Sequence, residues 1–116
     1  MVMQTGGYDR TILYRSPDGV DGPHGIEIVR FVWPPGSRTP NHDHSATGTV
    51  IVLEGALYEK KAGRTARITA GDVLVEVGMD VPHIVGNDGA EPAVSIHTYF
   101  TRQLRMNEYP DPPSTD

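Results

Sequence analysis

The stretch GSRTPNHDHSATGTVIVLEG, residues 36–55, begins with a glycine, contains two histidines one residue apart, and ends at a turn glycine. Its second half, Thr49–Glu54, is rich in β-branched residues and predicts a strand. In an extended chain, side chains two positions apart share a face, so His42 and His44 would project into one space. Two imidazoles in one space favour a metal ion, although a solvated surface pair has the same spacing.

The composition excludes several classes of protein. A chain of 116 residues has the length of one domain. The net charge is −5 and the basic residues do not cluster, which argues against nucleic acid and anionic membranes as partners. No apolar run approaches a membrane span and the start lacks a signal-peptide layout, so we expect a cytoplasmic protein. The chain has no cysteine, which excludes disulfides, thiolate metal sites and a cysteine nucleophile.

Glycines and prolines, 13 and 10 of them, interrupt the chain at short intervals, and no 3.6-residue apolar period lasts three turns. The predicted strands are Thr11–Arg15, Ile26–Trp33, Thr49–Glu54, Leu57–Lys60, Ala66–Thr69, Val73–Val77, His83–Val85 and Val94–Thr101. Many short strands separated by turn residues predict an all-β fold, a sandwich or a small closed barrel. We expect one domain over residues 1–103 with a short N-terminal arm, and a poorly ordered proline-rich tail over residues 104–116.

A third histidine follows a proline in VPHIVGN, residues 81–87. The spacing of the first stretch together with this later one resembles the two motifs of the cupin family, over most of residues 30–101. The resemblance implies a small antiparallel β-barrel of the jelly-roll type. It also implies that the paired histidines and the later one bind a metal, which gives the ligand role to His42, His44 and His83.

The chain departs from the cupin pattern at one ligand place. Cupins usually carry a glutamate four residues after the paired histidines, and Gly48 stands there; Glu54 is near but lies next to the turn glycine. The sequence therefore predicts three neutral histidines and no carboxylate, which leaves the full dipositive charge on the ion. Such a centre favours an anionic ligand and lowers the pKa of a bound thiol or water. Ligand count leaves the metal open between iron(II), zinc and other divalent ions.

The segment AVSIHTYF, residues 93–100, alternates polar and apolar side chains and places Ser95, His97 and Tyr99 on one face. Each has an alternative role, Tyr99 as a core residue and His97 as a hydrogen-bonded barrel histidine. Three polar groups on an inner face favour a functional chain, because buried polar atoms need partners.

The turn signal NDGAEP, residues 87–92, predicts a hairpin centred near Gly89. This pairing would set His83 roughly opposite Ser95 with His97 as its diagonal neighbour. We therefore expect His97 to lie beside the metal rather than to bind it.

The combination of RTPNHDH, VLEG, PHIVGNDGAEPAV and SIHTY is similar to the cysteine dioxygenase (thiol dioxygenase) family of cupins, especially its bacterial members. That resemblance implies ferrous iron held by the three histidines and a catalytic relay of Ser95, His97 and Tyr99. It further implies that a small thiol, cysteine, is oxidised by O2 to the sulfinic acid.

The same family holds the substrate carboxylate with an arginine in a Tyr-x-Arg segment, and GGYDRTILYR supplies Tyr8 and Arg10 in that place. A bidentate guanidinium–carboxylate pair suits a small amino acid, although Arg10 could also be a solvated surface charge. Relatives that use 3-mercaptopropionate commonly have a glutamine there, so Arg10 favours cysteine as the substrate.

Other functions stay open at this point. A cupin of this composition could bind a metal and a small ligand without catalysis, or be an enzyme using zinc, nickel or manganese. Few residues precede the Tyr-x-Arg segment, so the pocket is either open or closed by a second subunit of a homodimer. We expect Trp33 to pack at an end of the barrel rather than to stack on a substrate.

Overall fold

The computed structural model describes residues 4–17, 25–78, 81–100 and 106–113, and this part of the chain consists of strands and turns. The strands are β1 (Gln4–Thr5), β2 (Asp9–Arg15), β3 (Glu27–Trp33), β4 (Ser37–Arg38), β5 (Asn41–His44), β6 (Gly48–Glu54), β7 (Ala56–Lys61), β8 (Arg64–Thr69), β9 (Val73–Glu76), β10 (His83–Gly86), β11 (Ala93–Tyr99) and β12 (Met106–Tyr109). In the described ranges, no helix has the length and apolarity to cross a membrane. The predicted all-β class is confirmed.

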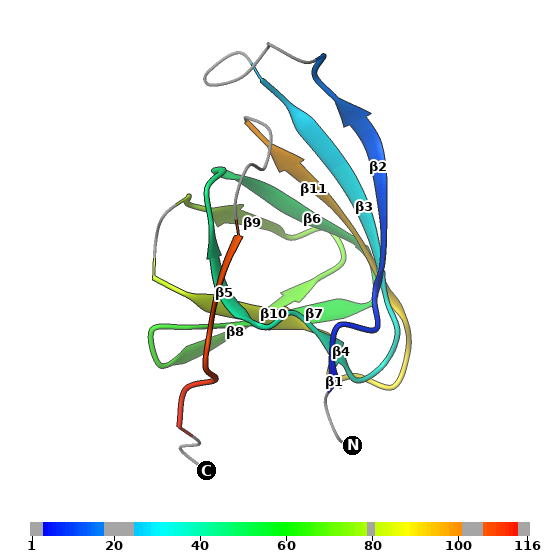
Figure 1. Ribbon diagram of the computed structural model, residues 1–116. Helices are drawn as coiled ribbons and strands as arrows, with labels where there is room; N and C mark the ends of the chain where they lie inside the picture. The colour runs from blue at the N-terminus through cyan, green and yellow to red at the C-terminus, as the bar shows by residue number, and fades with distance from the viewer. Residues whose placement is uncertain (1–3, 18–24, 79–80, 101–105, 114–116) are drawn as a thin grey trace.

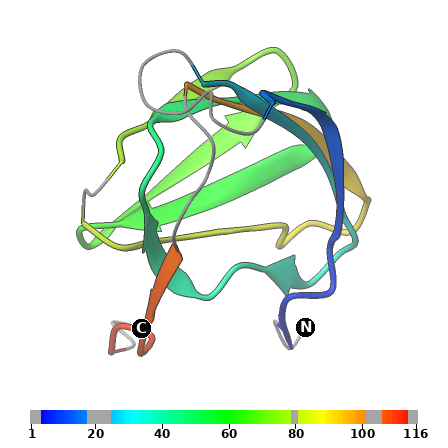
Figure 2. The same cartoon turned by 45° about the horizontal axis from the view of Figure 1, so that its top comes forward.

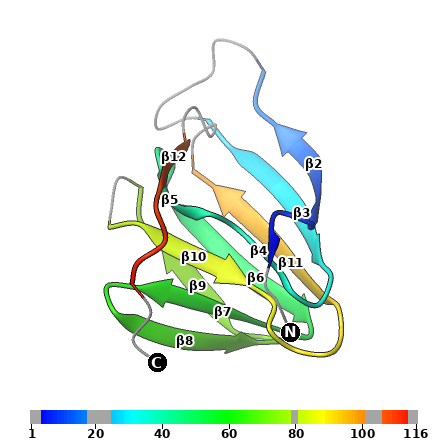
Figure 3. The same ribbon diagram turned by 60° about the horizontal axis from the view of Figure 1, so that its bottom comes forward.

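The strands form two sheets that curve around a shared interior (Figure 1). The five-stranded sheet has the order β2-β3-β11-β6-β9, and the seven-stranded sheet has the order β1-β4-β10-β5-β12, with β7 paired to β10 and β8 paired to β7. The views in Figures 2 and 3 show that the interior is ringed by strands from both sheets. All named pairs are antiparallel except the short pair β1 and β4. This is the small antiparallel barrel that the sequence predicts.

Alternation along β3 decides which side chains face the interior. Val29, Phe31 and Trp33 are buried, while the residues between them are partly or fully exposed. In the neighbouring strand β11, Ser95 pairs with Phe31 and His97 pairs with Val29, so these two polar side chains face the same interior. Because side chains alternate between the two faces of a strand, Ser95 and His97 lie next to the buried aromatic residues of β3.

The hairpin between β7 and β8 shows how local chemistry fixes the register. Lys61 pairs with Arg64 across a two-residue turn in which Ala62 and Gly63 have φ of 53° and 76°. Positive φ at both central residues is typical of a type I′ turn, whose twist matches that of the flanking strands.

The predicted hairpin around Gly89 is wrong. His83 on β10 pairs with His42 and Lys61, whereas Ser95 on β11 lies in the other sheet. The segment between them crosses from one sheet to the other and is held by the Asn87 amide, which donates to the carbonyls of Trp33 and Glu91 at 2.9 and 2.8 Å. These side-chain hydrogen bonds hold the loop that crosses between the sheets, in place of the strand pairing of a hairpin.

The C-terminal segment also differs from the prediction. Met106–Tyr109, within the segment that we expected to be a poorly ordered tail, forms strand β12 and pairs with β5. Two side chains secure it, since Asn107 and Tyr109 each donate a hydrogen bond of 2.8 Å to the carboxylate of Asp43. The N-terminal arm at residues 1–3, the predicted strand end at Thr101 and the last residues 114–116 lie outside the described ranges.

Candidate metal centre

Three histidines meet in the interior next to the seven-stranded sheet. His42 and His44 project from β5 on one side, and β10 runs beside β5 so that His83 is the direct partner of His42. Each residue is 4 % exposed, and one ring nitrogen from each lies within 4.8 Å of those of the other two. The structure thus brings together the three residues that the motif spacing selected as metal ligands.

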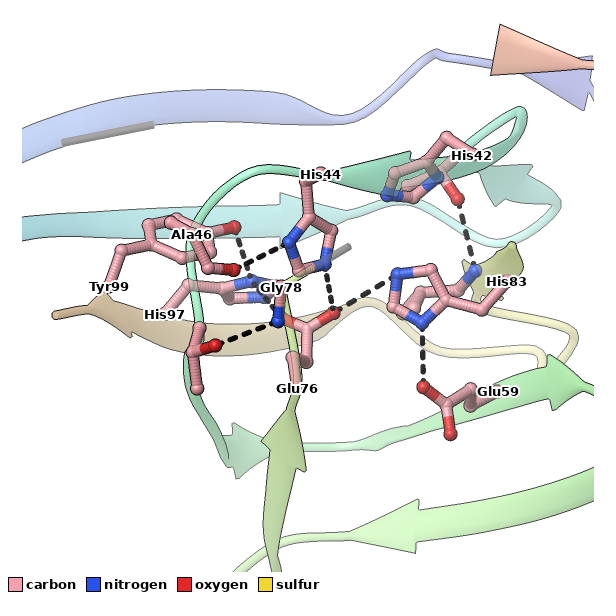
Figure 4. Close-up of polar contacts among 12 residues, drawn as sticks. His42, His44, Ala46, Glu59, Glu76, Gly78, His83, His97 and Tyr99 are labelled. Atoms are coloured by element: carbon pink, nitrogen blue, oxygen red, sulfur yellow. Dashed lines mark hydrogen bonds and ion pairs between the residues drawn. The ribbon is translucent and has the colours of Figure 1, made fainter. Parts of the chain in front are cut away.

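Each of these rings is oriented by a hydrogen bond from its Nδ1 atom, and Figure 4 shows those of His44 and His83. The partner atoms are Pro40 O at 2.8 Å from His42, Ala46 O at 2.7 Å from His44, and Glu59 Oε2 at 2.7 Å from His83. Carbonyl and carboxylate oxygens only accept hydrogen bonds, so Nδ1 is the protonated nitrogen in each ring. In the neutral ring, Nε2 therefore carries the lone pair that a metal ion requires.

A carboxylate stands in this centre, so the prediction of a centre without one is wrong. Glu76, at the end of β9, is 4 % exposed, and its Oε2 atom lies 3.4 Å from His44 Nε2 and 3.2 Å from His83 Nε2. Figure 4 shows its side chain between these two rings. The prediction failed because it looked for the carboxylate on the histidine-bearing segment, whereas the structure supplies it from a different strand.

The donor set fits a divalent cation. Within the described residues, the buried atoms His83 Nε2 and Glu76 Oε1 have no hydrogen-bond partner. A small cavity of about 10 Å³ opens beside them, and its lining includes His44, Glu76 and His83. Nitrogen lone pairs and a carboxylate that face one another across a few ångströms repel unless positive charge lies between them. A metal ion held by imidazole and carboxylate ligands would supply that charge.

The pKa values reflect the same arrangement. Burial lowers the pKa of His42 to about 4, which keeps its imidazole neutral at physiological pH. Burial alone would raise the pKa of Glu76, but its contact with His44 and the nearby imidazoles outweigh burial and lower it to about 2. Burial would also lower the pKa of His44, but the contact with Glu76 raises it instead. The carboxylate therefore stays ionised and attracts positive charge to the centre.

The three residues of the predicted relay lie on β11 and contact one another in a chain. Ser95 Oγ lies 3.0 Å from His97 Nε2, and His97 Nδ1 lies 3.3 Å from the Tyr99 hydroxyl. Trp33 Nε1 donates to Ser95 Oγ at 2.9 Å, so the indole, which we expected only to pack, starts the chain. The Ser95 oxygen accepts a hydrogen bond from Trp33, so the Ser95 hydroxyl can donate its proton to His97 Nε2. His97 then carries its own proton on Nδ1 and can donate it to the Tyr99 hydroxyl oxygen.

The relay lies next to the histidine cluster without being part of it. The rings of Tyr99 and His44 have centroids 6.1 Å apart, and His97 Nδ1 is 3.7 Å from Glu76 Oε1. Burial lowers the pKa of His97 to about 4 and raises that of Tyr99 above its ordinary value. Both groups are therefore neutral at physiological pH, and the Tyr99 hydroxyl keeps its proton to donate.

The two predicted substrate-binding residues are placed differently from each other. Tyr8 packs on Phe31 and Trp33, with ring centroids at 5.5 and 4.7 Å, and burial raises its pKa. The Arg10 side chain is 41 % exposed and its Nη2 atom lies 3.3 Å from Oε1 of the buried Glu27. Arg10 is thus a partner of Glu27, and its charge acts on the nearby His97 and Tyr99.

Residues 29–99 match the Cupin_2 family, described as a cupin domain. The chain belongs to the cupin family. Among solved structures, a cupin-like protein from Thermotoga maritima is 22 % identical with a TM-score of 0.74, over 92 % of this chain and 79 % of that one. A cupin 2 domain-containing protein from Halorhodospira halophila is 24 % identical with a TM-score of 0.72, over 90 % and 71 %. At these identities the likeness shows the shared barrel.

A recombinant oxalate oxidase in complex with glycolate is also similar, at 20 % identity and a TM-score of 0.70. This chain is covered over 90 % of its length and spans 56 % of that one. The cupin family thus includes enzymes, and this chain shares their barrel and has a histidine and glutamate cluster suited to a divalent metal.

Three features of the site were not predicted from the sequence: Glu76, Glu59 and the hydrogen bond of Trp33. The signal for Glu76 was present in DVLVEVG, residues 72–78, where a lone acid interrupts an apolar strand on the same face as Leu74. A carboxylate at an inward position of such a strand needs a partner in the interior. Glu59 had no comparable signal, because its strand mixes lysines and an aromatic residue around it.

Proposed function

We propose that this cupin is an iron(II)-dependent dioxygenase that oxidises cysteine, or a similar small thiol, to the sulfinic acid. The observation that carries the proposal is the meeting of two parts of the chain. Three oriented imidazoles share one space, and the Ser95–His97–Tyr99 chain ends beside them. Iron(II) held there would act as a Lewis acid for the thiol and as a redox centre for O2.

The reaction needs no further reductant, because both atoms of O2 enter the product: RSH and O2 give RSO2H. The protein residues bind and orient the reactants. Tyr99 donates its hydroxyl proton toward the substrate, and its position is fixed by His97 from behind. Arg10, on the same inner face, offers its remaining guanidinium donors to a substrate carboxylate while it also contacts Glu27.

The oxidation of a small carboxylic acid is a second candidate, which the similarity to an oxalate oxidase favours. Glu76 reduces the net positive charge of the centre and so weakens the electrostatic argument for a thiolate in particular. The similarity to an oxalate oxidase that binds glycolate supports testing oxalate and glycolate as alternatives to thiols.

Oxygen consumption by the iron-loaded protein separates these functions. We expect cysteine or a close thiol to drive O2 uptake, with about one sulfinate formed per O2, as mass spectrometry of the product would show. Uptake with oxalate or glycolate and none with thiols would move the assignment to the second candidate. Binding of a thiol, detected by anaerobic spectroscopic titration, without any O2 uptake would instead indicate a non-catalytic metal-binding cupin.

A further inference from the structure

Gly48 and Glu76 are direct partners across the strand pair β6 and β9. In the cupin pattern, position 48 is where a glutamate ligand is expected, and this chain has no side chain there. Opposite residues of an antiparallel pair place their Cβ atoms about 4.5–5.5 Å apart on the same face. Glu76 is therefore the residue of β9 that lies directly beside the place where the cupin pattern has its glutamate.

The backbone explains why β6 cannot provide that ligand. A Cβ atom on Gly48 would clash with the carbonyl oxygen of Thr98 and lie 3.0 Å from the Cα atom of Tyr99. Both contacts are with backbone of β11, which cannot move aside without breaking its pairing with β6. The close approach of β11 thus requires glycine at position 48 and leaves the neighbouring strand β9 to supply an acid.

Glu76 has the surroundings of a ligand rather than of a structural ion pair. Its ion-pair contacts within the described residues are with three imidazoles, His44, His83 and His97, and with no lysine or arginine. Its Oε1 atom is buried without a hydrogen-bond partner there. A buried carboxylate normally pairs with a cation.

We propose that Glu76 is the fourth ligand of the metal centre, supplied by β9 in place of a glutamate on β6. The ion would then be held by three neutral imidazoles and one carboxylate, so that its charge in the site falls from +2 to +1. This inference rests on the proposed metal centre and deepens it. A centre of this lower charge would attract anionic substrates less strongly than a three-histidine centre would.

Glu59 provides the contrast that makes the proposal testable. It contacts Nδ1 of His83, the nitrogen that faces away from the other two histidines, whereas Glu76 faces Nε2. Glu59 is therefore a positioning residue that orients His83. Loss of such a partner weakens metal binding by about 10–100-fold but leaves the set of metal ligands unchanged.

The experiment measures cobalt(II) binding by chelator competition together with the visible spectrum of the bound ion. The variants are Glu76→Gln, Glu76→Asp and, as the matched control, Glu59→Gln; the exposed Glu54→Gln controls for surface charge. We expect Glu76→Gln to weaken binding by about 100-fold and to change the band positions, because a charged ligand is lost. Glu59→Gln should weaken binding by about tenfold and keep the spectrum.

Glu76→Asp keeps the charge but withdraws the carboxylate by one methylene. A ligand role predicts a loss close to that of Glu76→Gln, whereas a long-range electrostatic role predicts an affinity close to that of the unchanged protein. If the unchanged protein fails to bind cobalt(II), the metal centre and the proposed function both fail. If it binds cobalt(II) and both Glu76 variants keep its affinity and spectrum, Glu76 is not a ligand and a three-histidine centre stands.

Discussion

Two buried carboxylates on the inner face of the same sheet have opposite surroundings. Glu27 on β3 is fully buried and meets two guanidinium groups, Arg10 at 3.3 Å and Arg15 at 2.7 Å. Glu76 on β9 is also buried, and the groups within ion-pair distance of it in the described chain are imidazoles. The difference lies in the chemistry of the partners.

An arginine carries its charge at every physiological pH, so Glu27 is compensated by the chain itself. A histidine is neutral unless it gains a proton, so Glu76 is compensated only when a proton or a metal ion joins the group. Glu27 therefore forms a complete structural ion pair with its arginines, whereas the group around Glu76 needs a bound cation. Substitutions of His83, Tyr99, Gly48 and Glu27 test this contrast.

Replacing His83 with alanine should have the largest effect, because it removes one of three neutral nitrogen ligands. We expect metal affinity to fall by about 10²–10³-fold, with a similar loss for His42→Ala and His44→Ala. Metal content of the purified protein and chelator competition would measure it. The matched control is His97→Gln, which we expect to keep the affinity within about tenfold, as suits a residue beside the ligands. Equal losses in all four variants would place His97 in the coordination sphere.

Tyr99→Phe should lower turnover by about 100-fold, because the variant keeps the ring and loses the proton donor at the end of the relay. Iron content should stay at the level of the unchanged protein, since the Tyr99 hydroxyl contacts His97 and the Tyr99 ring lies beside that of His44, with centroids 6.1 Å apart. Steady-state O2 uptake and iron analysis on the same sample would test both halves. Loss of iron would assign Tyr99 to the metal centre, and unchanged turnover would remove it from the reaction.

The sequence predicted the three clustered histidines well, because each prediction depended only on residues close together in the chain. His42 and His44 are two positions apart on a strand, so their shared face follows from the geometry of any extended chain. His83 was found through a second short motif, which needs no knowledge of pairing. The alternation of Ser95 and His97 on β11 likewise follows from one strand alone.

The carboxylate side of the site depends on which strands become neighbours. Glu76 belongs to the centre because β9 pairs with β6 and aligns it with Gly48, and no periodicity within β9 reports that register. The same limit explains the wrong pairing of His83 with Ser95, since a turn signal does not tell a hairpin from a crossing between sheets. It also explains the missed strand β12, whose partner β5 is far away in the chain.

Gly48→Ala tests the reason for the position of Glu76. The added methyl group would clash with the Thr98 carbonyl oxygen and lie 3.0 Å from Tyr99 Cα, both on β11, so the two strands must move apart or the backbone must distort. We expect a loss of about 1–3 kcal/mol in the free energy of unfolding, measured by urea denaturation. Gly89→Ala is the control, because its new methyl would meet the side-chain oxygen of Asn87 at 3.3 Å, and that contact is less tight. A neutral Gly48→Ala would show that β6 tolerates a side chain there.

Glu27→Gln should have the smallest effect on the site and decides whether the two ends are separate. The two arginine side chains are each 41 % exposed and can turn to water, so we expect a stability loss of only about 1 kcal/mol. Metal affinity, measured by the same cobalt(II) competition, should change by less than about twofold, since Glu27 contacts none of the three histidines. A loss comparable to that of Glu76→Gln would mean that both carboxylates act on the ion through a shared electrostatic field. In that case the specific contacts of Glu76 would no longer distinguish it as a ligand.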